Sequence, residues 1–451
     1  MSASFCKTLW CAIGLVSLGG LQAAETPSPA SNYSRAEFRV VLPAAPRPFP
    51  EPLPAGAAPG FKWRGTKGWA WTPEQYLAEI PHLARLKMNF LMNCYLSLFD
   101  LEQHPDWNQD PDSNRWWEPL PDAKRLAFEQ IVRECQSRGI EFCFGMNPNL
   151  KSRRIVNDGK SDSLDLLWQH YAWMQDLGVK WFNLSLDDIA HGCDASTQAR
   201  VANELFRRLR AHDPAAQFIF CPTFYSGPGL GQPPSPLEER TYLETLKREL
   251  HPEIFVFWTG DAVVGKITRR AAESYRAAVG HRLFLWDNYP VNDGYAALHL
   301  GPVVGRDPDL NAVVEGYMSN PHRQQNEINR LPLATCADYA YNPQAYDPVR
   351  SIGQAIWLFT ASAEQRQILA DLVDAYPGFL ICGSDKTEFN ALLKRHKQIA
   401  QMPQSRLVME GYLARLERLS ADLKRIFPTC YTATKARLDE DIGILKNTPL
   451  K

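Results

Sequence analysis

The chain has 451 residues, and its 49 basic and 50 acidic side chains leave a formal net charge of −1 at pH 7. This length is enough for a large hydrophobic core and for more than one domain. The near balance of charge gives no electrostatic basis for binding nucleic acid or an anionic membrane surface.

The first 24 residues have the pattern of a targeting segment. Lys7 precedes a mainly apolar run from Leu9 to Leu21, and Ala23-Ala24 supplies the small residues of a cleavage site. The run is too short, and too rich in glycine and serine, for a stable membrane span. We therefore expect a signal peptide over residues 1–24 and a periplasmic or secreted product.

The cysteines do not indicate a metal site. No C-x-x-C or H-E-x-x-H spacing occurs among them or the histidines, so we expect neither a metal nor another cofactor. Cys94, Cys143 and Cys221 lie within apolar runs, which favours buried free thiols over disulfides.

Residues 25–60 are rich in proline, alanine and serine, with Pro43, Pro46, Pro48 and Pro50 close together. Such a composition cannot bury a core of its own. We predict an extended linker, or a segment that lies over the surface of a folded domain.

Eight apolar runs of strand-like composition follow from residue 61. They are Phe61–Trp69, Met88–Leu96, Ile140–Asn147, Val179–Asp188, Gln217–Tyr225, Ile254–Gly260, Arg282–Asn288 and Ala312–Asn320. Helix-like stretches occupy most of the gaps, for example Leu126–Arg138 and Ser163–Leu177, each followed by a glycine that favours a helix end. Thr72-Pro73-Glu74-Gln75 has the pattern of a capping box at the start of another helix.

This alternation predicts an α/β fold, a (β/α)8 TIM barrel over residues 61–345. A doubly wound open sheet is the alternative, although the glycine-rich phosphate loop of its nucleotide-binding versions is absent. Beyond residue 345 the strand signal fades. Helical patterns there predict an all-helical C-terminal domain over residues 346–451, with segments at Ile356–Ala361, Gln367–Ala375, Phe389–Ala400 and Leu407–Phe427.

Polar and aromatic side chains gather at the predicted C-terminal ends of the strands, where barrel enzymes carry their sites. Asp187 and Asp188 close the fourth run, although aspartate is a poor strand residue. The other candidates are Tyr225, Trp258, Trp286, Asn288, Asp293 and Asn320. Amides, a phenol and indoles offer hydrogen bonds to sugar hydroxyls and flat faces for a sugar ring.

Two carboxyl groups suit glycosidic chemistry, because one can donate a proton while the other stays ionised. However, adjacent residues of a strand point to opposite faces. Asp187 and Asp188 can therefore serve one site only if the backbone turns where the strand ends.

Six segments resemble, in order and spacing, glycoside hydrolase family eighty-four, which comprises β-N-acetylglucosaminidases, including O-GlcNAcase, and some bacterial hyaluronidases. They are FNLSLDDI (182–189), FCPTFYSG (220–227), FWTG (257–260), LWDNYPVND (285–293), LGPVVG (300–305) and GYMSNP (316–321). The resemblance covers roughly residues 61–345. It implies a carbohydrate substrate that contains N-acetylglucosamine, and catalysis in which the substrate's acetamido oxygen forms an oxazoline.

The resemblance also implies roles for most of the candidates. Asp187 would orient the acetamido group, and Asp188 would be the general acid and then the base. Tyr225 would hold the acetamido group with Asn288 beside it. Asp293 and Asn320 would bind sugar hydroxyls, and Trp286 would line the pocket. Trp258 is a further substrate-binding candidate from its place at a strand end, although Trp258 and Trp286 could equally be core aromatics.

The first two strands depart from the family pattern. The family's second strand carries a lysine that binds sugar hydroxyls, and Leu98 stands in its place here. Another basic residue could substitute, and Lys62, Arg64 and Lys67 on the first strand are the candidates. We expect an exported retaining β-N-acetylglucosaminidase; the alternatives are an endo-acting hyaluronidase-like hydrolase and a glycan-binding protein without turnover.

Overall fold

The computed structural model describes residues 38–99, 114–160, 162–231, 236–292, 298–323, 327–378 and 391–450. The predicted signal peptide lies outside these ranges. Within them, no helix is long and apolar enough to cross a membrane.

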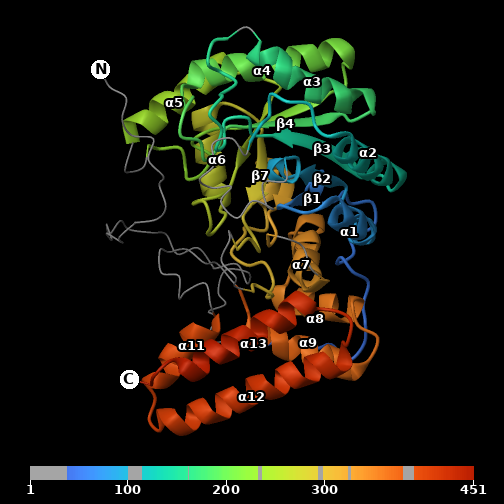
Figure 1. Cartoon of the computed structure of the whole chain (residues 1–451), viewed down its shortest axis with the longest axis vertical. Helices are drawn as coiled ribbons and strands as arrows, with labels where there is room; N and C mark the ends of the chain where they lie inside the picture. The colour runs from blue at the N-terminus through green and yellow to red at the C-terminus, as the bar shows by residue number, and fades with distance from the viewer. Residues whose placement is uncertain are drawn as a thin grey trace. The chain divides into compact units, whose positions relative to one another are not determined.

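Eight parallel strands pair in chain order and close into a barrel (Figure 1). The strands are β1 (Trp63–Gly68), β2 (Phe90–Asn93), β3 (Glu141–Met146), β4 (Trp181–Ser185), β5 (Gln217–Cys221), β6 (Phe255–Trp258), β7 (Leu283–Asp287) and β8 (Val314–Ser319). The closing ladder joins β1 to β8, with Trp63 opposite Gly316 and Thr66 opposite Ser319. Closure confirms the predicted (β/α)8 fold and excludes the open sheet.

Within the described residues, six α-helices alternate with the strands from β1 to β7. They are α1 (Pro73–Arg85), α2 (Asp122–Ser137), α3 (Ser163–Asp176), α4 (Ala195–His212), α5 (Pro236–Glu249) and α6 (Arg269–Val279). The predicted capping box at Thr72 and Gln75 is present at the start of α1. At the end of α6, Gly280 has a φ of 73°, a left-handed conformation that glycine adopts without steric cost.

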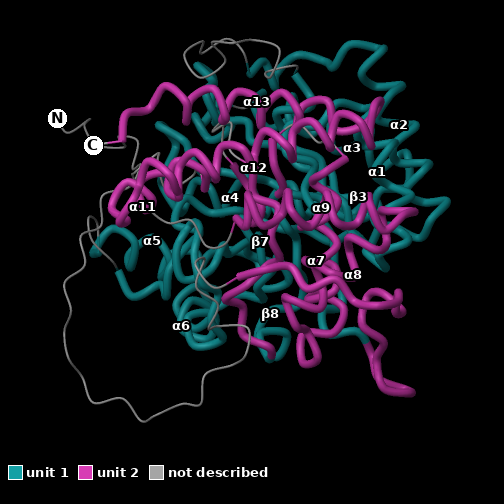
Figure 2. The backbone as a smooth tube through the Cα atoms, turned by 90° about the horizontal axis from the view of Figure 1, so that it is seen from below, with its two compact units in different colours: residues 1–9, 59–288, 309–320 teal, residues 10–58, 289–308, 321–451 magenta. Residues whose placement is uncertain are grey.

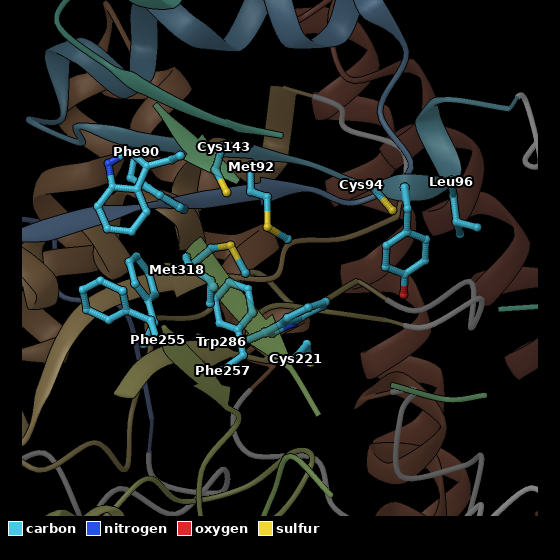
Figure 3. Close-up of a cluster of buried hydrophobic side chains, with 14 of the residues drawn as sticks. Phe90, Met92, Cys94, Leu96, Cys143, Cys221, Phe255, Phe257, Trp286 and Met318 are labelled. Carbon is cyan, nitrogen blue, oxygen red and sulfur yellow. The ribbon is translucent and has the colours of Figure 1, made fainter. Parts of the chain in front are cut away.

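The barrel interior is filled by side chains from alternate strand positions (Figure 3). The cluster includes Phe90 and Met92 of β2, Trp181 of β4, and Phe284 and Trp286 of β7. Cys94, Cys143 and Cys221 are buried free thiols in the same cluster, as predicted. This alternation decides which residues at the strand ends face the interior.

The described residues form two compact units (Figure 2). The barrel unit contains residues 59–288 and 309–320, and the helical unit contains residues 38–58, 289–308 and those from 321 onward. Its helices are α7 (Arg330–Tyr341), α8 (Pro348–Leu358), α9 (Ala363–Ala375), α11 (Ala391–Ala400), α12 (Ser405–Ile426) and α13 (Thr432–Asn447). The sequence predicted neither α7 nor α13. The predicted domain boundaries near residues 60 and 345 stay predictions.

Within the helical unit, the proline-rich segment 38–58 hydrogen-bonds to side chains of the helices. The N–H of Glu51 donates to Asp338 at 2.6 Å, and the Trp357 indole donates to the carbonyl of Pro43 at 2.9 Å. Because an extended proline-rich chain has no ladder partner, its backbone groups need such partners where they are shielded from water. Gly353 of α8 lies under this segment, where an added Cβ would come within 2.5 Å of the Val41 carbonyl oxygen.

Gly353→Ala should therefore destabilise the protein by about 1–3 kcal/mol, because the added methyl must displace backbone rather than a flexible side chain. Gly411→Ala on α12 is the matched control, since nothing lies within 4 Å of a Cβ there. That change should stabilise the helix by about 0.5–1 kcal/mol. Urea unfolding measures both, and equal effects would contradict close packing of the segment on α8.

Candidate active site

Asp187 faces the barrel interior at the end of β4. Trp181 of the same strand lies in the interior cluster, and a period of two places Asp187 on the same face. The N–H of Leu186 still donates to the Cys221 carbonyl at 2.9 Å, which extends the β4–β5 ladder beyond the last strand residue. Asp187 is 5% exposed.

Asp188 leaves the strand direction. Its φ of +53° lies in the left-handed region, which few side chains other than asparagine and aspartate adopt readily. The turn that the sequence required is present, and the Tyr225 hydroxyl donates to Asp188 Oδ1 at 2.9 Å. Solvent reaches Asp188, in contrast to the buried Asp187.

Asn147, directly after β3, holds Asp187 from the neighbouring strand. Its Nδ2 donates to the Asp187 carbonyl at 3.0 Å and to the carboxylate Oδ1 at 3.2 Å. Sequence reasoning did not select Asn147. The signal was nevertheless present, because a polar residue closes the third apolar run as Asp187 and Asp188 close the fourth.

Burial is the main reason that the pKa of each aspartate is raised above its ordinary value. For Asp187 the next cause is the negative charge of Asp188, and the positive charge of Lys67 acts in the opposite direction. Although Asp188 is accessible to water, the protein atoms packed around it desolvate its carboxylate. Two neighbouring carboxyls of this kind retain a shared proton to higher pH than isolated ones, and they titrate as a pair.

Three more predicted residues meet where β7 and β8 end. The Asn288 Oδ1 accepts from the Trp286 indole at 3.0 Å and from Asn320 Nδ2 at 2.9 Å. The Asn288 Nδ2 donates to the Val263 carbonyl. The Oδ1 of Asn320 is buried and accepts no hydrogen bond within the described part of the chain, so it is available to a hydroxyl donor.

Of the described candidates, Trp258 is not part of this group. Trp258 is fully buried, its indole donates to the Gly227 carbonyl at 2.8 Å, and its ring stacks on Tyr275 of α6. It therefore faces the helix layer. Asp293 lies outside the described residues.

The three basic candidates differ in position, since Arg64 and Lys67 belong to β1 and Lys62 precedes it. Arg64 donates to the carbonyls of Phe61, Lys62 and Lys87, which accounts for its charge near the start of the strand. Lys62 is exposed, 5.3 Å from the centre of the Trp63 ring.

Lys67 alone lies at the C-terminal end of the strand, 2% exposed. Its ammonium lies 3.9 Å from the centre of the Trp286 ring and 4.7 Å from that of Tyr95. Tyr95, like Asn147, was not among the candidates from the sequence.

No group of three or more histidine, cysteine, aspartate or glutamate side chains that could hold a metal ion occurs in the described ranges. The site itself offers carboxyl groups, amides and aromatic rings. Cleavage of a glycosidic bond by acid and base needs one carboxyl that keeps its proton near neutral pH and one that is ionised. The pair at the end of β4 meets that need, in a barrel mouth that also offers an indole face and amides to a sugar.

These features place the molecule among the glycoside hydrolases. The family model for β-N-acetylglucosaminidase matches residues 68–374 of the chain. The chain belongs to that family, glycoside hydrolase family eighty-four, as the six sequence segments predicted.

Among characterised proteins, the chain is similar to protein O-GlcNAcase of Rattus norvegicus, at 25% identity, and of Mus musculus, at 29%. Each alignment is 291 residues long and covers 61% of this chain and 29% of the relative. The chain thus spans less than a third of the length of these relatives.

Solved structures show the same fold. A point mutant of the O-GlcNAc hydrolase from Thermobaculum terrenum superimposes with a TM-score of 0.67 at 23% identity, covering 86% of this chain and 83% of that one. The protein CpGH84B superimposes with a TM-score of 0.65 at 20% identity, covering 86% of this chain and 67% of its own. At these identities the likeness concerns the fold alone.

Tyr225→Phe should raise the pKa of Asp188, because the tyrosine hydroxyl donates to the carboxylate and stabilises its ionised form. The limb of the kcat/KM–pH profile that Asp188 governs should move to higher pH by about one unit, the equivalent of about 1.4 kcal/mol. Tyr95→Phe is the control, since Tyr95 lies near both aspartates but its hydroxyl forms no hydrogen bond to either within the described chain. A limb that stays in place in Tyr225→Phe, or moves to lower pH, would contradict the assignment.

Proposed function

We propose that the protein is an exported, retaining β-N-acetylglucosaminidase whose nucleophile is the acetamido oxygen of its own substrate. The proposal rests on one observation: the two carboxyl groups belong to consecutive residues at the end of one strand. In a two-carboxylate retaining glycosidase, the acid and the nucleophile flank the scissile bond. Asp187 and Asp188 share one wall, so this geometry favours a nucleophile supplied by the sugar.

The different surroundings of the two carboxyls support different roles. Asp187 is buried and held by Asn147, which suits a group that stays fixed and accepts the acetamido N–H. Asp188 is accessible, which suits a group that exchanges a proton with the leaving oxygen and then with water.

In the proposed reaction, the acetamido carbonyl oxygen bonds to the anomeric carbon as the glycosidic C–O bond breaks. The proton of Asp188 passes to the leaving oxygen. Water then attacks the anomeric carbon and gives its proton to Asp188, while the bond between that carbon and the oxazoline oxygen breaks and the acetamido group is regenerated. Two displacements at one carbon retain the β configuration.

Fluorine on the acetamido group tests the identity of the nucleophile. Rates on aryl β-glucosaminides should fall steeply from N-acetyl to N-fluoroacetyl to N-trifluoroacetyl, because fluorine withdraws electron density from the attacking oxygen. We expect a total loss of more than about 100-fold in kcat/KM, or about 2.7 kcal/mol in the barrier. A flat series, or a trapped ester between the enzyme and the sugar, would rule the mechanism out.

In the same assay, Asp188→Ala distinguishes the role of the general acid from that of the nucleophile. This variant should lose about 10²–10⁴-fold on poor leaving groups and much less on activated aryl leaving groups, because only the former need a proton. Its dependence on N-fluorination should persist. Equal losses on both kinds of leaving group would assign the acid elsewhere.

Export is proposed on the composition of residues 1–24 alone. Fractionation of cells that express the full chain, alongside cells that express it from residue 25, tests this. Equal distribution of the two products between compartments would contradict export.

A further inference from the structure

The ammonium of Lys67 is buried among aromatic rings at the barrel mouth. Its Nζ lies 3.9 Å from the centre of the Trp286 ring, 4.7 Å from Tyr95 and 5.2 Å from Trp69. The residue is 2% exposed. Rings at these distances attract a cation through their negative faces, so they stabilise the charge in this position.

The rings do not satisfy the three N–H donors of the ammonium. Within the described part of the chain, Lys67 Nζ donates no hydrogen bond and forms no ion pair with a carboxylate. A buried charge without hydrogen bonds is costly. The donors are therefore available to acceptor atoms of a molecule that enters the mouth.

The position of Lys67 joins the two walls of the site. Trp286 belongs to the group with Asn288 and Asn320, while the positive charge of Lys67 also acts on Asp187 and Asp188. A sugar held between the aspartates and the Trp286 wall would bring its oxygen atoms towards Nζ.

The acceptors that fit best are neutral hydroxyl oxygens. Two carboxyl groups already occupy this mouth, and their pKa values are raised. A ligand carboxylate beside them would add like charge and meet repulsion. A hydroxyl oxygen accepts from an ammonium without that cost.

We propose that Lys67 is a sugar-binding residue, which donates hydrogen bonds from β1 to ring hydroxyl oxygens of a neutral N-acetylhexosamine at the Asp187–Asp188 pair. This inference rests on the proposed function for the identity of the sugar. The family resemblance assigns no role to this position of β1.

Lys67→Met tests the proposal, because methionine has a similar length without charge or donors. Lys62→Met, exposed and one residue before β1, is the matched control. Each protein is assayed on an aryl β-N-acetylglucosaminide and on its 3-deoxy, 4-deoxy and 6-deoxy analogues. Thermal unfolding of each variant reports whether it is folded.

The wild type should lose about 10- to 100-fold in kcat/KM on the deoxy analogue that lacks the contacted hydroxyl, the range of a hydrogen bond from a charged donor. On the parent substrate, Lys67→Met should lose a similar factor in kcat/KM relative to the wild type. On that analogue, its kcat/KM should be close to that of the wild type. Lys62→Met should behave as the wild type. This loss of discrimination is a signature that a structural role would not produce.

Two outcomes would overturn the proposal. Losses in folded Lys67→Met that are equal on the parent and every analogue, with a pH limb moved to higher pH, would mean that Lys67 only adjusts the charge of the pair. No loss at all would mean that it touches neither the substrate nor the pair.

The failure of the proposed function gives a different result. If the wild type cleaves no N-acetylglucosaminide, calorimetry with N-acetylglucosamine and its deoxy analogues replaces the rate measurement. If Lys67→Met weakens the binding of N-acetylglucosamine but not that of one deoxy analogue, the result would support the binding role in a protein without turnover. Equal binding by both proteins, or none by the wild type, would overturn it.

Discussion

Asp188 follows β4 with a φ of +53°, a left-handed conformation that costs a side chain with a Cβ about 1–2 kcal/mol. Had the strand continued in its extended form, Asp188 would point away from the interior that Asp187 faces. The turn lets two consecutive carboxyls serve one site. Strain of this kind persists where the surroundings hold it, and here the Leu186 N–H bonds to β5 on one side while Ile189 is buried on the other.

Within the described residues, neither aspartate at this turn forms an ion pair with Lys67. Burial raises the pKa of both aspartates, and the charge of Asp188 raises that of Asp187 further, while Tyr225 and Lys67 stabilise the ionised form of Asp188. If Lys67 formed a direct ion pair with one carboxylate, it would lower that pKa further, and the pair would lose the proton needed for acid catalysis. The aromatic rings stabilise the ammonium instead, so its charge acts on both carboxyls from a distance.

Periodicity predicted the barrel because each strand run is a continuous apolar stretch, bounded by caps and glycines that local geometry requires. The same reasoning missed α7 and α13 for physical reasons. In α7, every residue from Leu331 to Ala340 is buried, so no polar stripe marks a helical period. In α13, the N-cap is Tyr431 with a φ of 58° and no side-chain hydrogen bond, so no capping signal precedes it.

The candidate site shows what a strand end can and cannot reveal from sequence alone. Strands buried on both faces lack alternation of polar and apolar residues, so the face of each residue is not evident. In β6 the interior takes Phe255 and Phe257, and Trp258 consequently faces α6 although its motif stands at a strand end. In β1 the same parity places Lys67 with Trp63 on the inner face and turns Arg64 outward. The fold therefore follows from local patterns. Which strand-end side chains face the site depends on strand register, and only the closed barrel fixes that register.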